Sequence, residues 1–197
     1  MTDSIEVIDN FLPDDIFRGF ATTCMNHEFY CPLPYTALAE EDDGSISTFG
    51  ENLAPVTEKS FAEIMFSCVL YATHVSSHTV HDVYQGCPHW FKTMEEYLNV
   101  KRWILLRINC TMGQSKPHIG TYHVDFDERT QRNFKETTTA ILYLNTNNGG
   151  TKFRDSGKFV ESKMNRLVKF PTPTFHAGVW ATDAKLRFVL NMTYETK

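Results

Sequence analysis

The sequence lacks long hydrophobic runs and clusters of basic residues. No stretch approaches the ~18 consecutive apolar residues of a membrane-spanning helix. The opening residues, MTDSIEVIDN, are acidic where a secretory signal would be basic and then apolar. The formal net charge is −5, which argues against nonspecific binding to nucleic acid or to an anionic membrane. We therefore expect a cytoplasmic protein that has neither nucleic acid nor membrane as a partner.

Paired cysteines are lacking, because the cysteines are odd in number and widely scattered. The five cysteines stand far apart and form no C-x-x-C pair. The sequence therefore predicts neither a disulfide framework nor a zinc ribbon. Reduced thiols are the expectation, in keeping with a cytoplasmic setting.

The chain is long enough for one globular domain with a real core, because it has 197 residues of which 42% are hydrophobic. We expect a single domain, 1–197, in which residues 1–100 form a helix-containing lead-in. Apolar spacing and turn residues predict the segments of this lead-in. They are a strand at 5–8, a helix that starts near Asp14, a surface loop at 37–58, a helix at 61–72 and a short helix at 93–98.

Residues 101–197 have a different character, with short β-rich segments such as RWILLRINCTM, TTTAILYLNT, RLVKFPT and LRFVLNMTY. Turn sequences such as NTNNGG separate these segments. Several short strands spaced in this way are typical of a two-sheet barrel or sandwich, and a jelly roll is one way of closing such a set. The predicted fold is mainly β with flanking helices, an α+β chain with its β core at 101–197.

A candidate metal site begins in TYHVDFDE, at residues 121–128. On a strand, residues two apart project from the same face, so His123 and Asp125 can contact one metal ion. Further along, the strand in NRLVKFPTPTFHAG ends at His176. Two histidines and one carboxylate leave about three coordination positions open, which suits Fe(II) that binds an organic cosubstrate and O₂. These three residues are the candidate metal ligands.

Two alternatives compete with this assignment. In HVSSHTVHD, His74, His78 and His81 would share one face of a helix and could bind zinc. However, the glutamate of H-E-x-x-H is missing and the Ser- and Val-rich segment is a poor helix former, so we expect a solvated turn. His118 stands five residues before His123, but no aspartate follows two residues later. We therefore prefer His123.

The order of the motifs resembles a known family. Arg187 begins RFVLNMTY eleven residues after His176, and it alternates with Val189 and Asn191 on the polar face of that strand. Together with YHVD, TAILYLN, GGTKF and NRLVKFPTPTFHAG, this segment resembles the 2-oxoglutarate- and Fe(II)-dependent oxygenases, most of all their prolyl 4-hydroxylase-like branch. The resemblance covers residues 101–194 and, more faintly, IEVIDNFLP near the start.

The resemblance implies a double-stranded β-helix, a cupin-like jelly-roll core. It also implies iron held by His123, Asp125 and His176, and 2-oxoglutarate held by Arg187 with help from Tyr143. The implied reaction couples oxidative decarboxylation of 2-oxoglutarate by O₂ to hydroxylation of a substrate, with ascorbate as a candidate reductant. The implied substrate is a prolyl peptide or a small molecule, and the sequence does not choose between them.

The alternative is a protein of another functional class whose barrel uses the same cavity in another way. Such a barrel would bind a small molecule without catalysis, or would hold zinc and hydrolyse the bound molecule. Loss of a metal ligand would favour this interpretation. The sequence retains all three candidate ligands, so we prefer the oxygenase.

Overall fold

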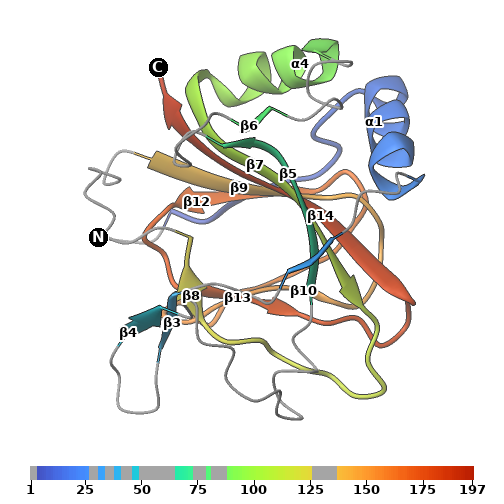
Figure 1. Cartoon of the computed structure of the whole chain (residues 1–197), viewed down its shortest axis with the longest axis vertical. Helices are drawn as coiled ribbons and strands as arrows, with labels where there is room; N and C mark the ends of the chain where they lie inside the picture. The colour runs from blue at the N-terminus through green and yellow to red at the C-terminus, as the bar shows by residue number, and fades with distance from the viewer. Residues whose placement is uncertain are drawn as a thin grey trace.

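A computed structural model of the chain describes residues 4–26, 31–33, 38–40, 46–48, 65–72, 79–80, 88–125 and 137–197. In this part of the chain two antiparallel β-sheets face each other, and two helices cover the outer side of the larger sheet (Figure 1). This mainly β arrangement with flanking helices is the predicted jelly roll, so the predicted fold class is confirmed.

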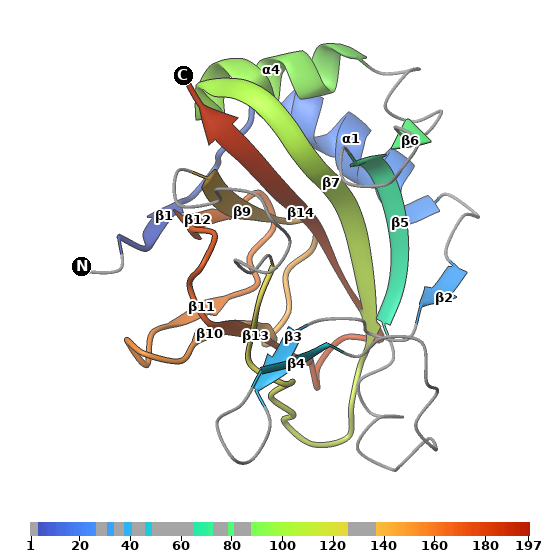
Figure 2. The same cartoon turned by 60° about the vertical axis from the view of Figure 1, so that its left-hand side comes forward.

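The larger sheet has eight strands in the order β1-β12-β9-β14-β7-β5-β2, with β6 paired to β5. Figure 2 displays β14, β7 and β5 as long curved neighbours within it. The strands are β1 (Glu6–Ile8), β2 (Cys31–Leu33), β5 (Met65–Ala72), β6 (Thr79–Val80), β7 (Val100–Met112), β9 (Thr137–Tyr143), β12 (Leu167–Pro171) and β14 (Leu186–Thr196).

The smaller sheet has six strands in the order β11-β10-β13-β8-β3-β4. In Figure 1 it lies across from β9, β12 and β14. Its strands are β3 (Leu38–Glu40), β4 (Ile46–Thr48), β8 (His123–Val124), β10 (Gly150–Phe153), β11 (Phe159–Glu161) and β13 (His176–Val179).

The helices within the described ranges are α1 (Asp14–Asn26) and α4 (Pro88–Leu98). Two aspartates in the first turn of α1 favour its N-terminus, where the helix dipole is positive. The buried positions of α1 recur every three or four residues and place one apolar stripe against the sheet. Phe20 of α1 contacts Trp90 and Phe91 of α4 through edge-on aromatic pairs. The helices thus share one hydrophobic cluster with the outer side of the larger sheet.

Alternation along β14 separates the two sides of the larger sheet. Phe188, Leu190 and Met192 belong to the cluster beneath the helices. Val189 belongs to a second cluster, together with Phe153 and Val160 of the smaller sheet. Successive strand residues point to opposite faces, so the residues on the same face of β14 as Val189 line the space between the sheets. The predicted polar inner face of this strand, with Arg187 and Asn191, therefore faces the interior.

Two predictions for the lead-in are wrong. The predicted helix at 61–72 is strand β5 over Met65–Ala72, which pairs with β7 along most of its length. Buried residues occur on both faces of this strand, and a continuous apolar run of this kind cannot be told from a buried helix by its spacing. The predicted loop at 37–58 contains β3 and β4, which pair with each other. Residues 61–64 and the remainder of that loop lie outside the described residues.

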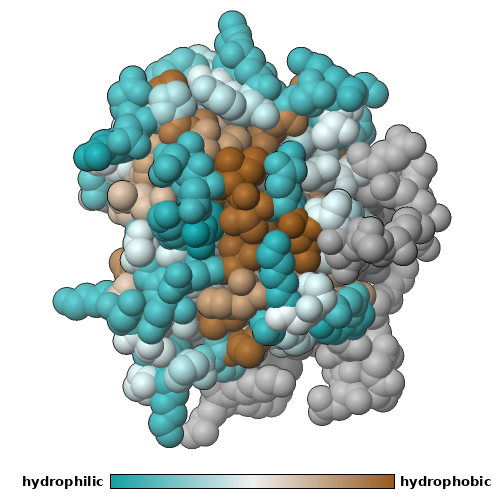
Figure 3. Space-filling model, turned by 180° about the vertical axis from the view of Figure 1, so that it is seen from behind, coloured by the Kyte–Doolittle hydropathy of each residue, from teal (hydrophilic) through white to brown (hydrophobic). Residues whose placement is uncertain are grey.

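Other predictions for the lead-in are close to what is found. The strand at 5–8 and the helix from Asp14 correspond to β1 and α1, and the short helix at 93–98 is the second half of α4. No helix in the described ranges is long and apolar enough to cross a membrane. The face seen from behind is largely hydrophilic, with a hydrophobic strip down its middle (Figure 3).

Candidate metal centre

The two candidate histidines are direct partners in the smaller sheet. His123 of β8 lies opposite His176 of β13 in the antiparallel register, and their ring centroids are 4.6 Å apart. Asp125 follows His123 by two residues, which projects its carboxylate to the same side. One strand pair thus brings together residues that are more than 50 positions apart in the sequence.

The three side chains form a compact and buried cluster. Asp125 Oδ1 lies 3.9 Å from His123 Nε2, and Asp125 Oδ2 lies 3.8 Å from His176 Nε2. Both distances are too long for hydrogen bonds. One potential ligand atom from each residue lies within 4.8 Å of the others. This spacing leaves room for a cation between the donor atoms.

The hydrogen bonding of the cluster also fits a metal. Asp125 Oδ2 is buried and has no hydrogen-bond partner among the described residues, which is costly for a carboxylate oxygen unless a cation or donor satisfies it. His123 Nδ1 lies 3.1 Å from the Thr121 carbonyl oxygen, and His176 Nδ1 lies 3.0 Å from that of Thr174. Each Nδ1–H therefore donates to the backbone, which leaves the Nε2 lone pair directed at the cluster.

The electrostatics of the cluster suit a divalent cation. Burial lowers the pKa of the His123 imidazole to about 4, with a smaller contribution from His176, so His123 is neutral at pH 7. Burial alone would raise the pKa of Asp125, but the nearby His176, His123 and Arg107 together lower it below its usual range. A neutral imidazole and an ionised carboxylate are the forms that bind metal.

A buried cation lies on the inner face of β14. Arg187 is only 5% exposed, and its guanidinium donates one hydrogen bond, 3.0 Å long, to the Gly150 carbonyl oxygen. Its Nε is buried without a partner, and no carboxylate within the described ranges influences its pKa, which burial lowers. A buried guanidinium without a counter-charge is a natural site for an anion.

Tyr143 lies beside this arginine. The Arg187 Cζ atom is 5.6 Å from the centroid of the Tyr143 ring. The phenol is fully buried, which raises the pKa of its hydroxyl. That hydroxyl lies 2.8 Å from the Thr151 hydroxyl and 3.2 Å from the Val160 carbonyl oxygen. It already has internal partners, and Thr151, from the GGTKF segment, joins it as a further polar residue at this end of the interior.

Sequence reasoning placed Asn191 on the polar face of its strand and gave Arg107 no role beyond lining, so it missed that both lie near the cluster. Asn191 Nδ2 donates a long hydrogen bond of 3.5 Å to Asp125 Oδ1. Arg107 lies directly across from Asn191 in the register of β7 and β14. The available signal was the alternation in RINCT, which places Arg107, Asn109 and Thr111 on one face of the strand.

Of the alternative metal ligands, His118 has other surroundings, and the three histidines of HVSSHTVHD are not described. His118 stacks edge-on against Trp180, with centroids 5.1 Å apart, and does not join the cluster. His74, His78 and His81 lie outside the described residues.

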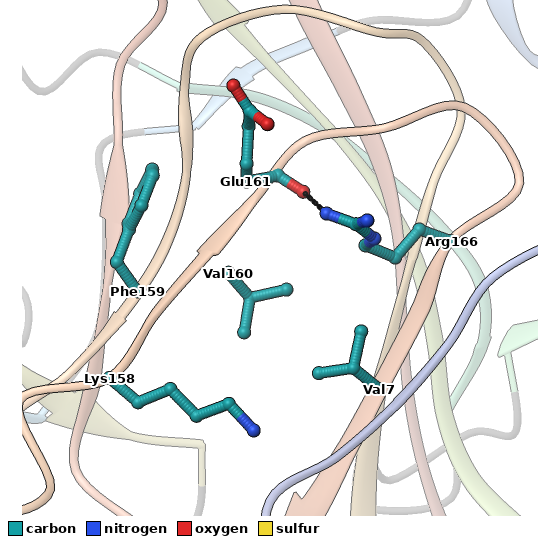
Figure 4. A pocket seen from close by; sticks show the side chains of 6 residues that line it. All are labelled: Val7, Lys158, Phe159, Val160, Glu161 and Arg166. Carbon is teal, nitrogen blue, oxygen red and sulfur yellow. Dashed lines mark hydrogen bonds between the residues drawn. The ribbon is translucent and has the colours of Figure 1, made fainter.

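A surface pocket of about 450 Å³ lies apart from the metal cluster (Figure 4). It contains none of the predicted site residues, because its lining comes from β1, β11 and their surroundings. The lining residues are Val7, Lys158, Phe159, Val160, Glu161 and Arg166.

Comparison with known proteins places the fold. No family model matches the sequence, and no curated protein sequence matches it. Among solved structures, a prolyl-4-hydroxylase from Pseudomonas putida matches 100% of this chain and 94% of its own, with a TM-score of 0.54 and 15% identity. A 2OG-Fe(II) oxygenase family oxidoreductase from Burkholderia pseudomallei matches 96% of this chain and 84% of its own, with a TM-score of 0.59 and 7% identity.

A third solved structure extends the range of described activities. SnoN, a non-haem α-ketoglutarate-dependent epimerase from nogalamycin biosynthesis, matches 98% of this chain and 78% of its own, with a TM-score of 0.55 and 14% identity. At such low identities the likeness establishes the fold. This chain has the jelly-roll fold of the 2-oxoglutarate- and Fe(II)-dependent oxygenases, as it occurs in prolyl 4-hydroxylases.

Proposed function

We propose that this protein is a non-haem Fe(II) dioxygenase that couples oxidative decarboxylation of 2-oxoglutarate to hydroxylation of an organic substrate. One observation carries the proposal. Within the part of the chain that the structure describes, the buried cluster of two histidines and an aspartate has an unsatisfied carboxylate oxygen, and a buried arginine without a counter-charge lines the same interior. A metal ion and a dicarboxylate would satisfy both.

In this proposal His123, Asp125 and His176 hold the metal through two Nε2 atoms and one carboxylate. Three protein ligands leave about three coordination positions for cosubstrate and O₂. The backbone hydrogen bonds to both Nδ1 atoms fix the ring orientations before metal binds. Asn191 holds the Asp125 carboxylate from the side of the larger sheet.

Arg187 would bind the far carboxylate of 2-oxoglutarate, because a guanidinium grips a carboxylate with two hydrogen bonds and keeps its charge when buried. Tyr143 and Thr151 would complete the polar end of the cavity. When bound, Fe(II) and 2-oxoglutarate supply the oxidative chemistry with O₂, which releases succinate and CO₂. The protein excludes water and orients the reacting groups.

The substrate and the setting belong to the proposal as well. The fold is found in a prolyl-4-hydroxylase and in an epimerase from nogalamycin biosynthesis, so a prolyl peptide and a small molecule are both compatible with it. Cys24, Cys68 and Cys110 are buried thiols that form no disulfide. Reduced thiols and a ferrous centre both suit the cytoplasm, with ascorbate as reductant.

Succinate formation tests the proposal directly. Purified protein is incubated with Fe(II), ascorbate, O₂ and 2-oxoglutarate without a prime substrate, and slow uncoupled turnover to succinate is expected. The exposed Asp155 provides a control, since Asp155→Ala should retain the turnover that Asp125→Ala loses. If no succinate forms while the Zn²⁺-loaded protein hydrolyses a small ester or amide, the zinc barrel would be the better account.

A further inference from the structure

The inner face of the larger sheet carries a second arginine, Arg107. On β7 its neighbours Leu106 and Ile108 pack beneath the helices, so its own side chain projects into the interior. In the register it lies across from Asn191, which in turn lies across from Ile141 of the second cluster. Directly opposite residues of an antiparallel sheet share a face. Arg107 therefore stands beside the residue that contacts Asp125.

Arg107 is close to the candidate metal ligands without being tied to them. Asn191, which lies directly across from Arg107 in the register, donates a hydrogen bond of 3.5 Å to Asp125 Oδ1. Nevertheless the Arg107 Nε is buried without a hydrogen-bond partner among the described residues. The residue as a whole is only partly buried, whereas Arg187 is buried.

Among the described residues, the charges of the site leave Arg107 uncompensated. In the proposed complex, a divalent metal ion and Arg187 supply three positive charges, while Asp125 and dianionic 2-oxoglutarate supply three negative ones. These charges cancel. Arg107 adds one positive charge beside the metal ligands, in a partly desolvated place where an unpaired charge is costly.

We propose that Arg107 binds an anionic group, a carboxylate or a phosphate, of the prime substrate and so selects acidic substrates for this site. The inference rests on the proposed function. A guanidinium on the rigid β7 strand would orient such a substrate with two directed hydrogen bonds. In the proposed function Arg187 binds the far carboxylate of the cosubstrate, so the two arginines would have separate ligands.

The test uses full-length protein loaded with Mn²⁺ and saturating 2-oxoglutarate without oxygen. Acetate and methylphosphonate serve as anionic probes, and acetamide serves as the uncharged control of similar size. Mn²⁺ shortens the proton relaxation time of any methyl group held near it, so the methyl signals report binding beside the metal. The variants are Arg107→Met, Arg107→Lys and, as a charge-matched control on the exposed end of the same strand, Lys101→Met.

We expect saturable relaxation enhancement for at least one anionic probe and little for acetamide. Arg107→Met should weaken that binding at least about tenfold, since it removes charge-assisted hydrogen bonds. Lys101→Met should match the wild type, Arg107→Lys should retain part of the binding, and 2-oxoglutarate affinity should change less than twofold in all three.

Two results would overturn the inference alone: equal enhancement in Arg107→Met, or no difference between the anions and acetamide in the wild type. A large loss of 2-oxoglutarate affinity in a folded Arg107→Met protein would assign this arginine to the cosubstrate instead. Failure of the wild-type protein to bind Mn²⁺ and 2-oxoglutarate would overturn the proposed function as well.

Discussion

The two faces of strands β7 and β14 are built in opposite ways. The outer face packs beneath the helices through Leu106, Ile108, Cys110, Phe188, Leu190, Met192 and Tyr194. Within the described ranges, seven buried side-chain N or O atoms lack a hydrogen-bond partner, and five belong to the inner face of these two strands. Those five are in Arg107, Thr111, Arg187, Asn191 and Thr193.

The difference separates stability from function within single strands. Burial of apolar area stabilises the outer face, at roughly 25 cal/mol per Å² removed from water. Unsatisfied polar atoms on the inner face cost stability, and such local conflicts are expected where a protein binds its ligands. We infer that the inner face is completed by ligands and the outer face by the helices. Substitutions on the two faces should therefore have different consequences.

The largest effect is expected at Asp125. Asp125→Ala removes the only carboxylate of the cluster, so metal affinity and succinate formation should fall by more than the roughly 10- to 100-fold typical of outer partners of metal ligands. The free energy of unfolding without metal should not fall, because a buried carboxylate oxygen without a partner disappears. Metal analysis after gel filtration and urea unfolding measure the two quantities. Retained metal with lost stability would mean a structural aspartate.

On the outer face, Leu190→Ala should destabilise the protein by about 2 to 5 kcal/mol, because Leu190 is fully buried in the main cluster. The 2-oxoglutarate affinity of the folded fraction should stay unchanged. Urea unfolding followed by circular dichroism measures the loss.

The adjacent residue on the other face provides the matched variant. Asn191→Leu should leave stability unchanged or raise it, since it removes a buried amide oxygen that has no partner. Metal affinity should fall, because the hydrogen bond to Asp125 is lost. If both variants lost stability equally, the proposed division between the two faces would be wrong.

A smaller effect is expected at Arg187. Arg187→Gln should weaken 2-oxoglutarate binding at least tenfold, equivalent to about 1.4 kcal/mol, while metal affinity stays nearly the same. Titration of the oxygen-free, iron-loaded protein measures both affinities. Unaltered 2-oxoglutarate affinity would mean that another cation holds the cosubstrate or that the barrel does not use it.

The smallest effect concerns an ion pair outside both faces. Asp9 accepts hydrogen bonds from Arg166 and Lys163, and the bond to Arg166 is the main cause that lowers the pKa of Asp9 below its usual range. The carboxylate is 40% exposed, so solvent screening limits its contribution to about 1 kcal/mol or less.

Because the folded pKa is depressed, this stabilisation is present above the unfolded pKa of about 3.9 and is lost as pH falls toward the folded value. Asp9→Asn should therefore be slightly less stable than the wild type at pH 7, and the difference should shrink below about pH 4. Urea unfolding at pH 7 and pH 3.5 checks this. A difference that is the same at both pH values would exclude ionisation as its source.

The sequence was a good guide where a local pattern of residues indicates which distant residues lie together in the fold. The H-x-D pair is such a pattern, and the structure places it together with His176, although the role of the three residues as ligands stays a prediction. The predicted strand ending at His176 is wrong, because β12 ends at Pro171 and a separate strand, β13, begins at His176. The alternation around Val189 predicted which side of β14 is polar. The family resemblance supplied the roles of Arg187 and Tyr143, which no local pattern assigns.

The sequence was a poor guide where pairing with a distant strand decides the structure. β5 has apolar residues on both faces, so its pattern favoured a helix, whereas pairing with β7 and β2 makes it a strand. β3 is short and lies in an acidic, turn-rich segment, and its pairing with β8 makes it a strand. The sequence indicated only that Arg107 lines the interior, because its position beside Asn191 depends on the register of β7 and β14.

The central claim is that the inner face of β7 and β14, with the facing cluster of the smaller sheet, is completed by a metal ion and 2-oxoglutarate. Its most direct test is an anaerobic titration of the Fe(II)-loaded protein with 2-oxoglutarate, followed by the visible absorption of the metal chelate. We predict saturation at one 2-oxoglutarate per chain in the wild type and in Leu190→Ala, with no absorption band in Asp125→Ala. An absent band in the wild type, or an equal band in Asp125→Ala, would contradict the account.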